Sequence, residues 1–213
     1  MSRHGDPDDD VLVVLAGGRS SRFQGDKALA EFAAPDAGER TGSESLTGRV
    51  LRQLAPLASR RAVVRAAPLG GLPEGVATIA DPRPGDGPLQ ALAAAFAALP
   101  ARRWFVAPCD APLLDPEIYY ELARSLASTS ARGGGKPPSA VAAWNDGRCE
   151  ALVSIWTPTA AAPLAAWLAA EPRLPVHVAL ARLGAARCDF ADARPFLNVN
   201  TRADLVLAGE ALR

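Results

Sequence analysis

Short apolar runs alternate with longer stretches rich in alanine and leucine through the first half of the chain. The runs are continuously apolar, which is typical of strands that helices cover on both faces of a sheet. Strand, helix and strand follow one another at the spacing of a mostly parallel α/β sheet. The pattern predicts strands at residues 11–16, 61–65, 76–80 and 104–107, and helices at 46–59, 88–99 and 115–127.

The first predicted helix has an apolar face and several candidate N-caps. Its apolar residues recur at steps of three and four, which places them on one side of a helix: Leu46, Val50, Leu54 and Leu57. Thr41 would form a capping box with Glu44, and Ser43 or Ser45 would serve equally well. Asp115 is the expected cap of the third helix.

The second half of the chain is less regular and predicts a hairpin insertion. Asp146-Gly147 is a tight-turn signal between two strand candidates, at 139–144 and 151–156. Helices are expected at 158–170 and 175–183, and Thr201 is the expected cap of a last helix. Two segments with little apolar content predict surface loops, at 34–43 and 131–138.

Composition and charge argue against several classes of protein. The 213 residues suit one domain, predicted over 11–213 after a disordered acidic tail at 1–10. The net charge is zero, which argues against a general nucleic-acid or membrane-surface binder, and no apolar run reaches the roughly 18 residues of a membrane span. The three cysteines are far apart and form no disulfide framework, which predicts a reducing, cytoplasmic location.

A glycine-rich, cationic segment follows the first predicted strand. Gly17 and Gly18 allow a sharp turn and a close approach to a ligand, and successive N–H groups in such a turn form an anion-binding concavity. Arg19, Arg22 and Lys27 add donors suited to phosphate. The spacing matches neither a Walker A loop nor GxGxxG. Taken alone, the segment is equally compatible with a basic surface loop.

Two aspartates end predicted parallel strands, at the edge where open α/β sheets bind ligands. Asp81 closes the run "VATIAD" and Asp110 closes "WFVAPCD". A carboxylate at this edge can hold Mg²⁺, which prefers one or two carboxylates together with phosphate oxygens. Each aspartate alone could instead cap a helix. Cys109 fits a small buried side chain better than a nucleophile.

These residues carry a resemblance to the molybdenum cofactor guanylyltransferases, within the larger nucleotidyltransferase superfamily. The opening motif alone is shared with many sugar and lipid-precursor nucleotidyltransferases, but the whole set, in order along almost the entire chain, is specific. The matching segments are Leu15-Ala16-Gly17-Gly18-Arg19-Ser20-Ser21-Arg22 with Asp26-Lys27, Asp81 with Gly87-Pro88-Leu89, Pro108-Cys109-Asp110-Ala111-Pro112-Leu113, and Asn198-Val199-Asn200-Thr201.

The resemblance implies a three-layer, Rossmann-like nucleotidyltransferase fold and an enzyme that transfers GMP from GTP to the terminal phosphate of molybdopterin or molybdenum cofactor. Proteins that hand over the pterin would be its further partners. Lys27, Arg22 and Asp110 would be catalytic, with Mg²⁺ on Asp110, and Asn198 and Asn200 would face the pterin. The implied nucleotide-binding residues are Leu15, Ala16, Gly17, Gly18, Arg19, Lys27, Asp81 and Asp110.

The chain departs from the family pattern at a few positions, which keeps two alternatives open. Gln24 stands where the family has glycine, and so does Ala91. Arg65-Ala66-Ala67 stands where an asparagine is common, and Ala151 replaces a proline. The alternatives are a cytidylyl- or sugar-phosphate nucleotidyltransferase on the same scaffold, and a non-catalytic nucleotide-binding module.

Overall fold

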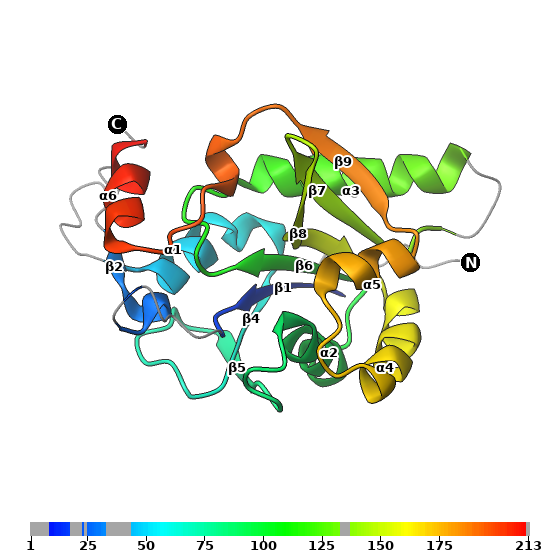
Figure 1. The fold of residues 1–213 in the computed structure, drawn as a ribbon, viewed down its shortest axis with the longest axis horizontal. Coiled ribbons are helices and arrows are strands. Elements are labelled where there is room, and N and C mark those ends of the chain that lie inside the picture. The colour runs from blue at the N-terminus through cyan, green and yellow to red at the C-terminus, as the bar shows by residue number, and fades with distance from the viewer. Residues whose placement is uncertain (1–8, 18–22, 24, 33–43, 133–136, 212–213) are drawn as a thin grey trace.

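A seven-stranded, mostly parallel sheet lies between two layers of helices in the computed structural model (Figure 1). The structure describes residues 9–17, 23, 25–32, 44–132 and 137–211. Strand β8 is antiparallel to both of its neighbours, β6 and β7, and the other pairs are parallel. In spatial order the strands are β5 (Val76–Ala80), β4 (Arg60–Arg65), β1 (Asp10–Leu15), β6 (Arg103–Pro108), β8 (Arg148–Trp156), β7 (Ala140–Asn145) and β9 (Ala186–Phe190).

The helices divide between the two faces of the sheet, and a small two-stranded ribbon stands apart from it. The helices are α1 (Leu46–Gln53), α2 (Pro88–Ala98), α3 (Pro116–Arg132), α4 (Ala161–Ala170), α5 (Val176–Arg182) and α6 (Arg202–Glu210). The short 3-10 helices are η2 (Lys27–Leu29), η3 (Ala55–Leu57), η4 (Pro158–Ala160) and η5 (Arg194–Phe196), and the ribbon pairs β2 (Glu31–Phe32) with β3 (Glu44–Ser45). No helix in the described ranges is long and apolar enough to cross a membrane.

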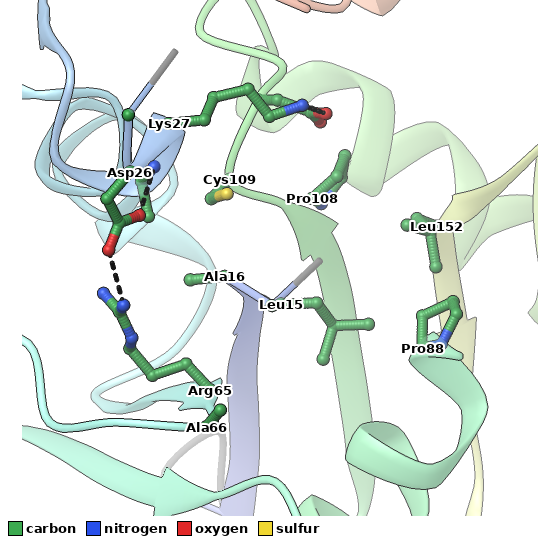
Figure 2. A pocket seen from close by; sticks show the side chains of 14 residues that line it. Leu15, Ala16, Asp26, Lys27, Arg65, Ala66, Pro88, Pro108, Cys109 and Leu152 are labelled. Carbon is green, nitrogen blue, oxygen red and sulfur yellow. Dashed lines mark hydrogen bonds and ion pairs between the residues drawn. The ribbon is translucent and has the colours of Figure 1, made fainter. Parts of the chain in front are cut away.

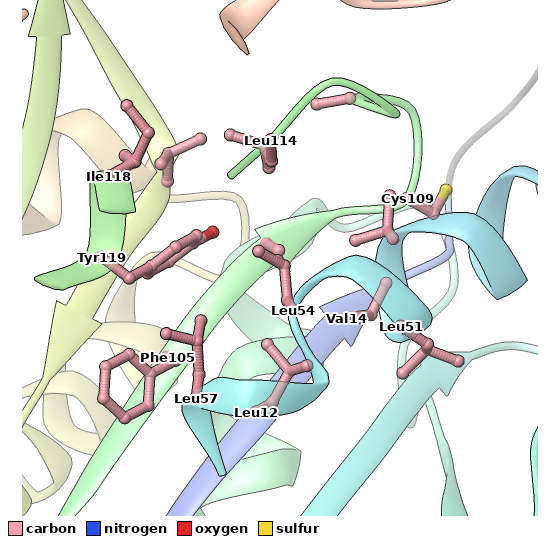
Figure 3. Packing of buried hydrophobic residues seen from close by; sticks show 14 of the residues in the cluster. Leu12, Val14, Leu51, Leu54, Leu57, Phe105, Cys109, Leu114, Ile118 and Tyr119 are labelled. Atoms are coloured by element: carbon pink, nitrogen blue, oxygen red, sulfur yellow. The ribbon is translucent and has the colours of Figure 1, made fainter. Parts of the chain in front are cut away.

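Strand β1 runs through the centre of the sheet and is buried along its whole length. Leu12 and Val14 pack with α1 and with Tyr119 of α3 on one face (Figure 3). Val11 and Val13 pack on the other face, in a second core that includes α2, α4 and α5. Because successive strand residues point to opposite faces, a continuously apolar run serves both cores. The expected α/β class is confirmed.

The remaining strands confirm the hairpin and add elements that the sequence pattern did not predict. Asp146 and Gly147 join β7 to β8 with positive φ angles of 48° and 71°, as a tight hairpin turn requires. Strand β5 is an edge strand and is partly exposed, so its apolar run is not covered on both faces. Strand β9 pairs with β7 and was not predicted, nor was the ribbon of β2 and β3.

The helix boundaries differ from the predicted ones for local reasons. Helix α1 ends at Gln53 rather than 59 because Pro56 cannot continue the hydrogen-bond ladder, and the chain goes on as η3. Ser45 caps α1, since its Oγ accepts from the N–H of Gly48. Helix α3 continues to Arg132, into the predicted loop at 131–138. Thr41, Ser43 and the predicted loop at 34–43 lie outside the described residues.

Two other predicted caps are confirmed. The carboxylate of Asp115 accepts from the N–H of Glu117 at 2.8 Å, in the first turn of α3. Thr201 and Asp204 form a reciprocal capping box at the start of α6. The N–H of Asn200 also donates to the carboxylate of Asp204 and holds its pKa below the ordinary value.

Asp10 corrects the predicted boundary of the acidic tail, whose residues 1–8 lie outside the described part. It is the first residue of β1 and only 2% exposed. Its Oδ2 lies 3.1 Å from Nη2 of Arg102 and 2.6 Å from Nη2 of Arg103. Two guanidinium groups therefore compensate the burial of this charge, which sequence position alone did not indicate.

We expect Asp10→Ala to lower the free energy of unfolding by about 2 kcal/mol, because it removes charge-assisted hydrogen bonds to two arginines that remain partly hydrated. Urea unfolding at an unchanged m-value would measure the loss. The matched control is Asp9→Ala, whose side chain is exposed and should cost less than about 0.5 kcal/mol. Equal stability of the two variants would contradict a structural role for the Asp10 carboxylate.

Candidate functional site

A cavity of about 310 Å³ lies at the carboxyl-end edge of the sheet, where the chain leaves β1, β4 and β6 (Figure 2). The 3-10 helix η2 and the start of α2 complete its wall. The described residues that line it are Leu15, Ala16, Gly17, Gly25, Asp26, Lys27, Ala28, Arg65, Ala66, Pro88, Pro108, Cys109, Asp110 and Leu152. Predicted site residues from three separate sequence segments therefore share one cavity.

Lys27, Asp110 and Asn200 meet at this cavity although they are far apart in the sequence. The Nζ of Lys27 donates to Oδ2 of Asp110 at 2.6 Å and to Oδ1 of Asn200 at 3.1 Å. The carbonyl of Asp110 accepts from the N–H of Val199 at 2.7 Å, so the main chain also holds the C-terminal segment against β6. Both charged side chains are largely buried, which strengthens their attraction.

Asp26, the residue before Lys27, fixes the position of the lysine. Asp26 caps η2, with Oδ1 accepting from the N–H of Ala28 at 3.1 Å, and this fixes the turn on which Lys27 is the first residue. In the sequence, Asp26 stands out only as part of a motif. Its short polar side chain ahead of a helical turn is nevertheless a recognisable cap signal.

A second cavity of about 290 Å³ adjoins the first at Asp110. Strand β8 contributes Arg148 and Glu150 to it, and the segment before α6 contributes Asn198 and Asn200. The two cavities share Pro108 and Leu152 as well, so Asp110 stands at the boundary between them. A molecule in one cavity and a molecule in the other would meet at this carboxylate.

The carboxylate of Asp110 fits a divalent cation. Its Oδ1 is buried and accepts no hydrogen bond from the residues that the structure describes, while Oδ2 is bound to Lys27. Those residues contain no cluster of three or more His, Cys, Asp or Glu side chains that could hold a metal by themselves. A single free carboxylate oxygen suits Mg²⁺, which commonly takes its other ligands from substrate phosphates and water.

Arg65 lines the cavity, although in the sequence it stands out only as a departure from the family pattern. Its Nη2 donates to Oδ2 of Asp26 at 2.7 Å, on the side of the cavity opposite Pro108 and Leu152 (Figure 2). A signal was present, because Arg65 is the last residue of β4 and so lies at the same sheet edge as Asp110.

Asp81 lies beside the cavity rather than among the residues that line it. A Cβ atom added to Gly17 would lie 3.8 Å from Oδ2 of Asp81, so the two are neighbours. Oδ1 of Asp81 accepts from the N–H of Arg83 at 2.9 Å, which stabilises the turn after β5. This turn contact accounts for one oxygen of Asp81. The expected contact between Asp81 and a nucleoside stays a prediction.

Cys109 lines the cavity as a neutral thiol. Burial, together with the neighbouring Asp110 carboxylate, raises the pKa of Cys109 to about 12. A thiol with this pKa carries almost no thiolate near neutral pH and is a poor nucleophile. The expectation of a small buried side chain is therefore supported by its surroundings.

Three predicted site residues, Gly18, Arg19 and Arg22, lie outside the described residues, as does Gln24. Leu15, Ala16, Gly17 and Lys27 flank that segment and line the cavity. The predicted glycine-rich, cationic segment therefore begins and ends at the cavity wall.

The strand order and the helices on both faces of the sheet define the fold of a nucleotidyltransferase. The sequence model of the MobA-like NTP transferase domain matches residues 12–184, and the chain belongs to this family. It is an enzyme of the nucleotidyltransferase class, and the expected family resemblance is confirmed.

Relatives with assigned names match over nearly the whole chain. The molybdenum cofactor guanylyltransferase of Sinorhizobium fredii is 31% identical, over 94% of this chain and 90% of its own length. That of Rhizobium johnstonii is 33% identical, over 94% of this chain and 93% of its own length. Both matches therefore cover far more of the chain than the residues of the cavity.

Solved structures show the same fold. Molybdopterin-guanine dinucleotide biosynthesis protein A from Archaeoglobus fulgidus superposes with a TM-score of 0.70 at 22% identity, over 94% of this chain and 97% of that one. A 2-C-methyl-D-erythritol 4-phosphate cytidylyltransferase from Thermus thermophilus reaches 0.62 at 18% identity, over 96% and 99%. At these identities the likeness concerns the fold alone, which is shared by enzymes that differ in nucleotide and acceptor.

Proposed function

We propose that this protein transfers GMP from GTP to the terminal phosphate of molybdopterin or its molybdenum-loaded form, with release of pyrophosphate. The observation that carries the proposal is the Lys27–Asp110 pair at the boundary of two cavities, one flanked by the glycine-rich segment and one lined by Asn198 and Asn200. The relatives reported above are named molybdenum cofactor guanylyltransferases, and this supports the choice of substrates.

The reaction needs no covalent enzyme intermediate. A phosphate oxygen of the acceptor forms a bond to the α-phosphorus of GTP, and the bond from that phosphorus to the oxygen bridging to the β-phosphate breaks, so pyrophosphate leaves. The enzyme contributes position and charge stabilisation, as in phosphoryl transfer generally. The shared boundary of the two cavities brings donor and acceptor to one place.

Lys27 would stabilise the negative charge that develops on the departing pyrophosphate. Its ammonium group is largely buried and held by Asp110 and Asn200, so little reorganisation is needed when charge moves toward it. Arg22, with the N–H groups of the segment from Gly17 to Arg19, would complete the set of donors around the triphosphate. Asp81 would fix the nucleoside.

Asp110 would hold Mg²⁺ through its free Oδ1, together with phosphate oxygens of the bound nucleotide. Such an ion neutralises phosphate charge and increases the electrophilicity of the α-phosphorus. Lys27 would face the phosphates from the Oδ2 side of the same carboxylate.

Asn198 and Asn200 would contact the acceptor from the second cavity, where Arg148 offers a cation for an anionic ligand. Proteins that deliver the pterin would approach from this side. We place the reaction in the cytoplasm, since the three cysteines are free thiols, as is usual in a reducing compartment.

Nucleotide selectivity tests the proposal. We expect pyrophosphate release with GTP and a pterin phosphate acceptor to exceed release with CTP, ATP or UTP by at least ~10-fold, as a base-specific site provides. A preference for CTP, or turnover with a sugar phosphate in place of the pterin, would instead favour another transferase of the same fold. Binding of GTP without any pyrophosphate release, with acceptor and Mg²⁺ present, would indicate a non-catalytic nucleotide-binding module.

A further inference from the structure

Arg65 has two hydrogen-bond donors that no described residue accepts. Its side chain is 12% exposed and lines the nucleotide cavity at the end of β4. Nη2 is paired with Asp26, but Nε and Nη1 are buried and have no hydrogen-bond partner among the described residues. Buried polar groups are nearly always satisfied, and an unsatisfied N–H beside a cavity calls for a partner that the protein itself does not supply.

The guanidinium is held in place rather than free to swing. Oδ2 of Asp26 binds Nη2, while Oδ1 of the same carboxylate caps η2. The arginine is thereby tied to the turn that positions Lys27. A donor fixed in this way loses little conformational entropy when it binds a ligand.

The order of the strands indicates which part of a nucleotide would reach Arg65. Along the ligand edge, β4 and β5 lie on one side of β1, and β6 and β8 lie on the other. Lys27 and Asp110 stand on the β6 side, where the acceptor cavity begins. The reacting phosphate has to face that cavity, so the nucleoside extends the other way, toward Arg65 and the neighbour of Gly17, Asp81.

We propose that Arg65 selects guanine by donating from one of its unused N–H groups to the O6 acceptor of the base. An arginine donor suits this carbonyl oxygen, whereas adenine and cytosine present an amino group at the corresponding edge. The inference rests on the proposed binding of GTP. It concerns this chain's own arginine, since the family resemblance places an asparagine in this region.

The test is nucleotide binding without acceptor, so that it does not depend on turnover. Wild type, Arg65→Met and the control Arg61→Met would be titrated calorimetrically with GTP, ITP and ATP in the presence of Mg²⁺. Arg61 lies at the other end of β4 and does not line the cavity, so its variant matches the loss of charge on the same strand. ITP keeps O6 and N7 but lacks the 2-amino group of guanine.

We expect Arg65→Met to lose about 10- to 100-fold in affinity for GTP and ITP alike, with little change for ATP. Arg61→Met should bind all three nucleotides as wild type does, and circular dichroism should show both variants folded. Equal losses for GTP, ITP and ATP would mean a contact with ribose or phosphate and would overturn the inference.

The same titrations separate this inference from the proposed function. GTP binding by wild type with unchanged selectivity in Arg65→Met would overturn the role of Arg65 alone. A wild-type chain that bound none of the three nucleotides would overturn the proposed GTP binding, and the inference with it.

Discussion

Asp110→Asn should lower the proposed Mg²⁺-dependent guanylyl transfer by ~100-fold or more, by analogy with the loss of one charge-stabilising group from a preorganised site. The amide keeps the shape of the side chain and its neighbour Lys27, but it removes the charge from the oxygen that would hold the cation. Pyrophosphate release at saturating GTP and acceptor would measure the loss. The Mg²⁺ concentration for half-maximal activity should rise at the same time.

The matched control for this variant is Asp115→Ala, an acidic residue five positions later that caps α3. It should cost about 1 kcal/mol of stability through the lost cap, with turnover like that of wild type. Circular dichroism of Asp110→Asn should be unchanged. Wild-type-like turnover in Asp110→Asn would refute the assignment of the cation to this carboxylate.

Lys27→Met should also lower kcat/KM for GTP by ~100-fold or more, but for a different reason. The variant keeps the length of the side chain and removes the ammonium group that lies between Asp110 and Asn200. Because the cation competing for Asp110 is gone, the Mg²⁺ requirement should not rise. The two variants should therefore lose similar activity, while the Mg²⁺ concentration for half-maximal activity should rise only in Asp110→Asn.

Lys136→Met is the control for the lysine, since position 136 holds the other lysine of the sequence and lies outside every motif. It should leave kcat/KM unchanged. If Lys27→Met instead raised the Mg²⁺ requirement as Asp110→Asn does, the lysine would act by organising the cation site, and its direct role on pyrophosphate would be disproved.

The sheet and its ligand edge could be predicted because each depends on local patterns. The continuously apolar residues of β1 and β6 indicate burial on both faces, and the Asp-Gly turn indicates the hairpin. The proximity of Asp110 to the segment that follows β1 was also expected, since parallel strands bring their carboxyl ends to one edge. These predictions needed only periodicity, turn chemistry and strand direction.

The features that escaped prediction depend on contacts between distant segments. Strand β9 has the sequence "ARCDF", which is too short and too charged to predict a strand. It forms a strand because it pairs with β7. Arg65 on β4 belongs to the cavity because Asp26 comes from the other side of it, 39 positions earlier. Asn200 was expected to face the acceptor, and its bond to Lys27 across 173 positions has no local signature.

The bond from Asn200 to Lys27 has a practical consequence for shortened versions of this protein. The match to the family domain ends at residue 184, and a chain cut there would keep β1, η2 and β6 and thus both charges of the ion pair. It would lose the asparagine that restrains the ammonium group and the N–H of Val199 that secures the loop after β6. Trimming to the recognisable domain would therefore keep Lys27 and Asp110 but remove two contacts that fix their positions.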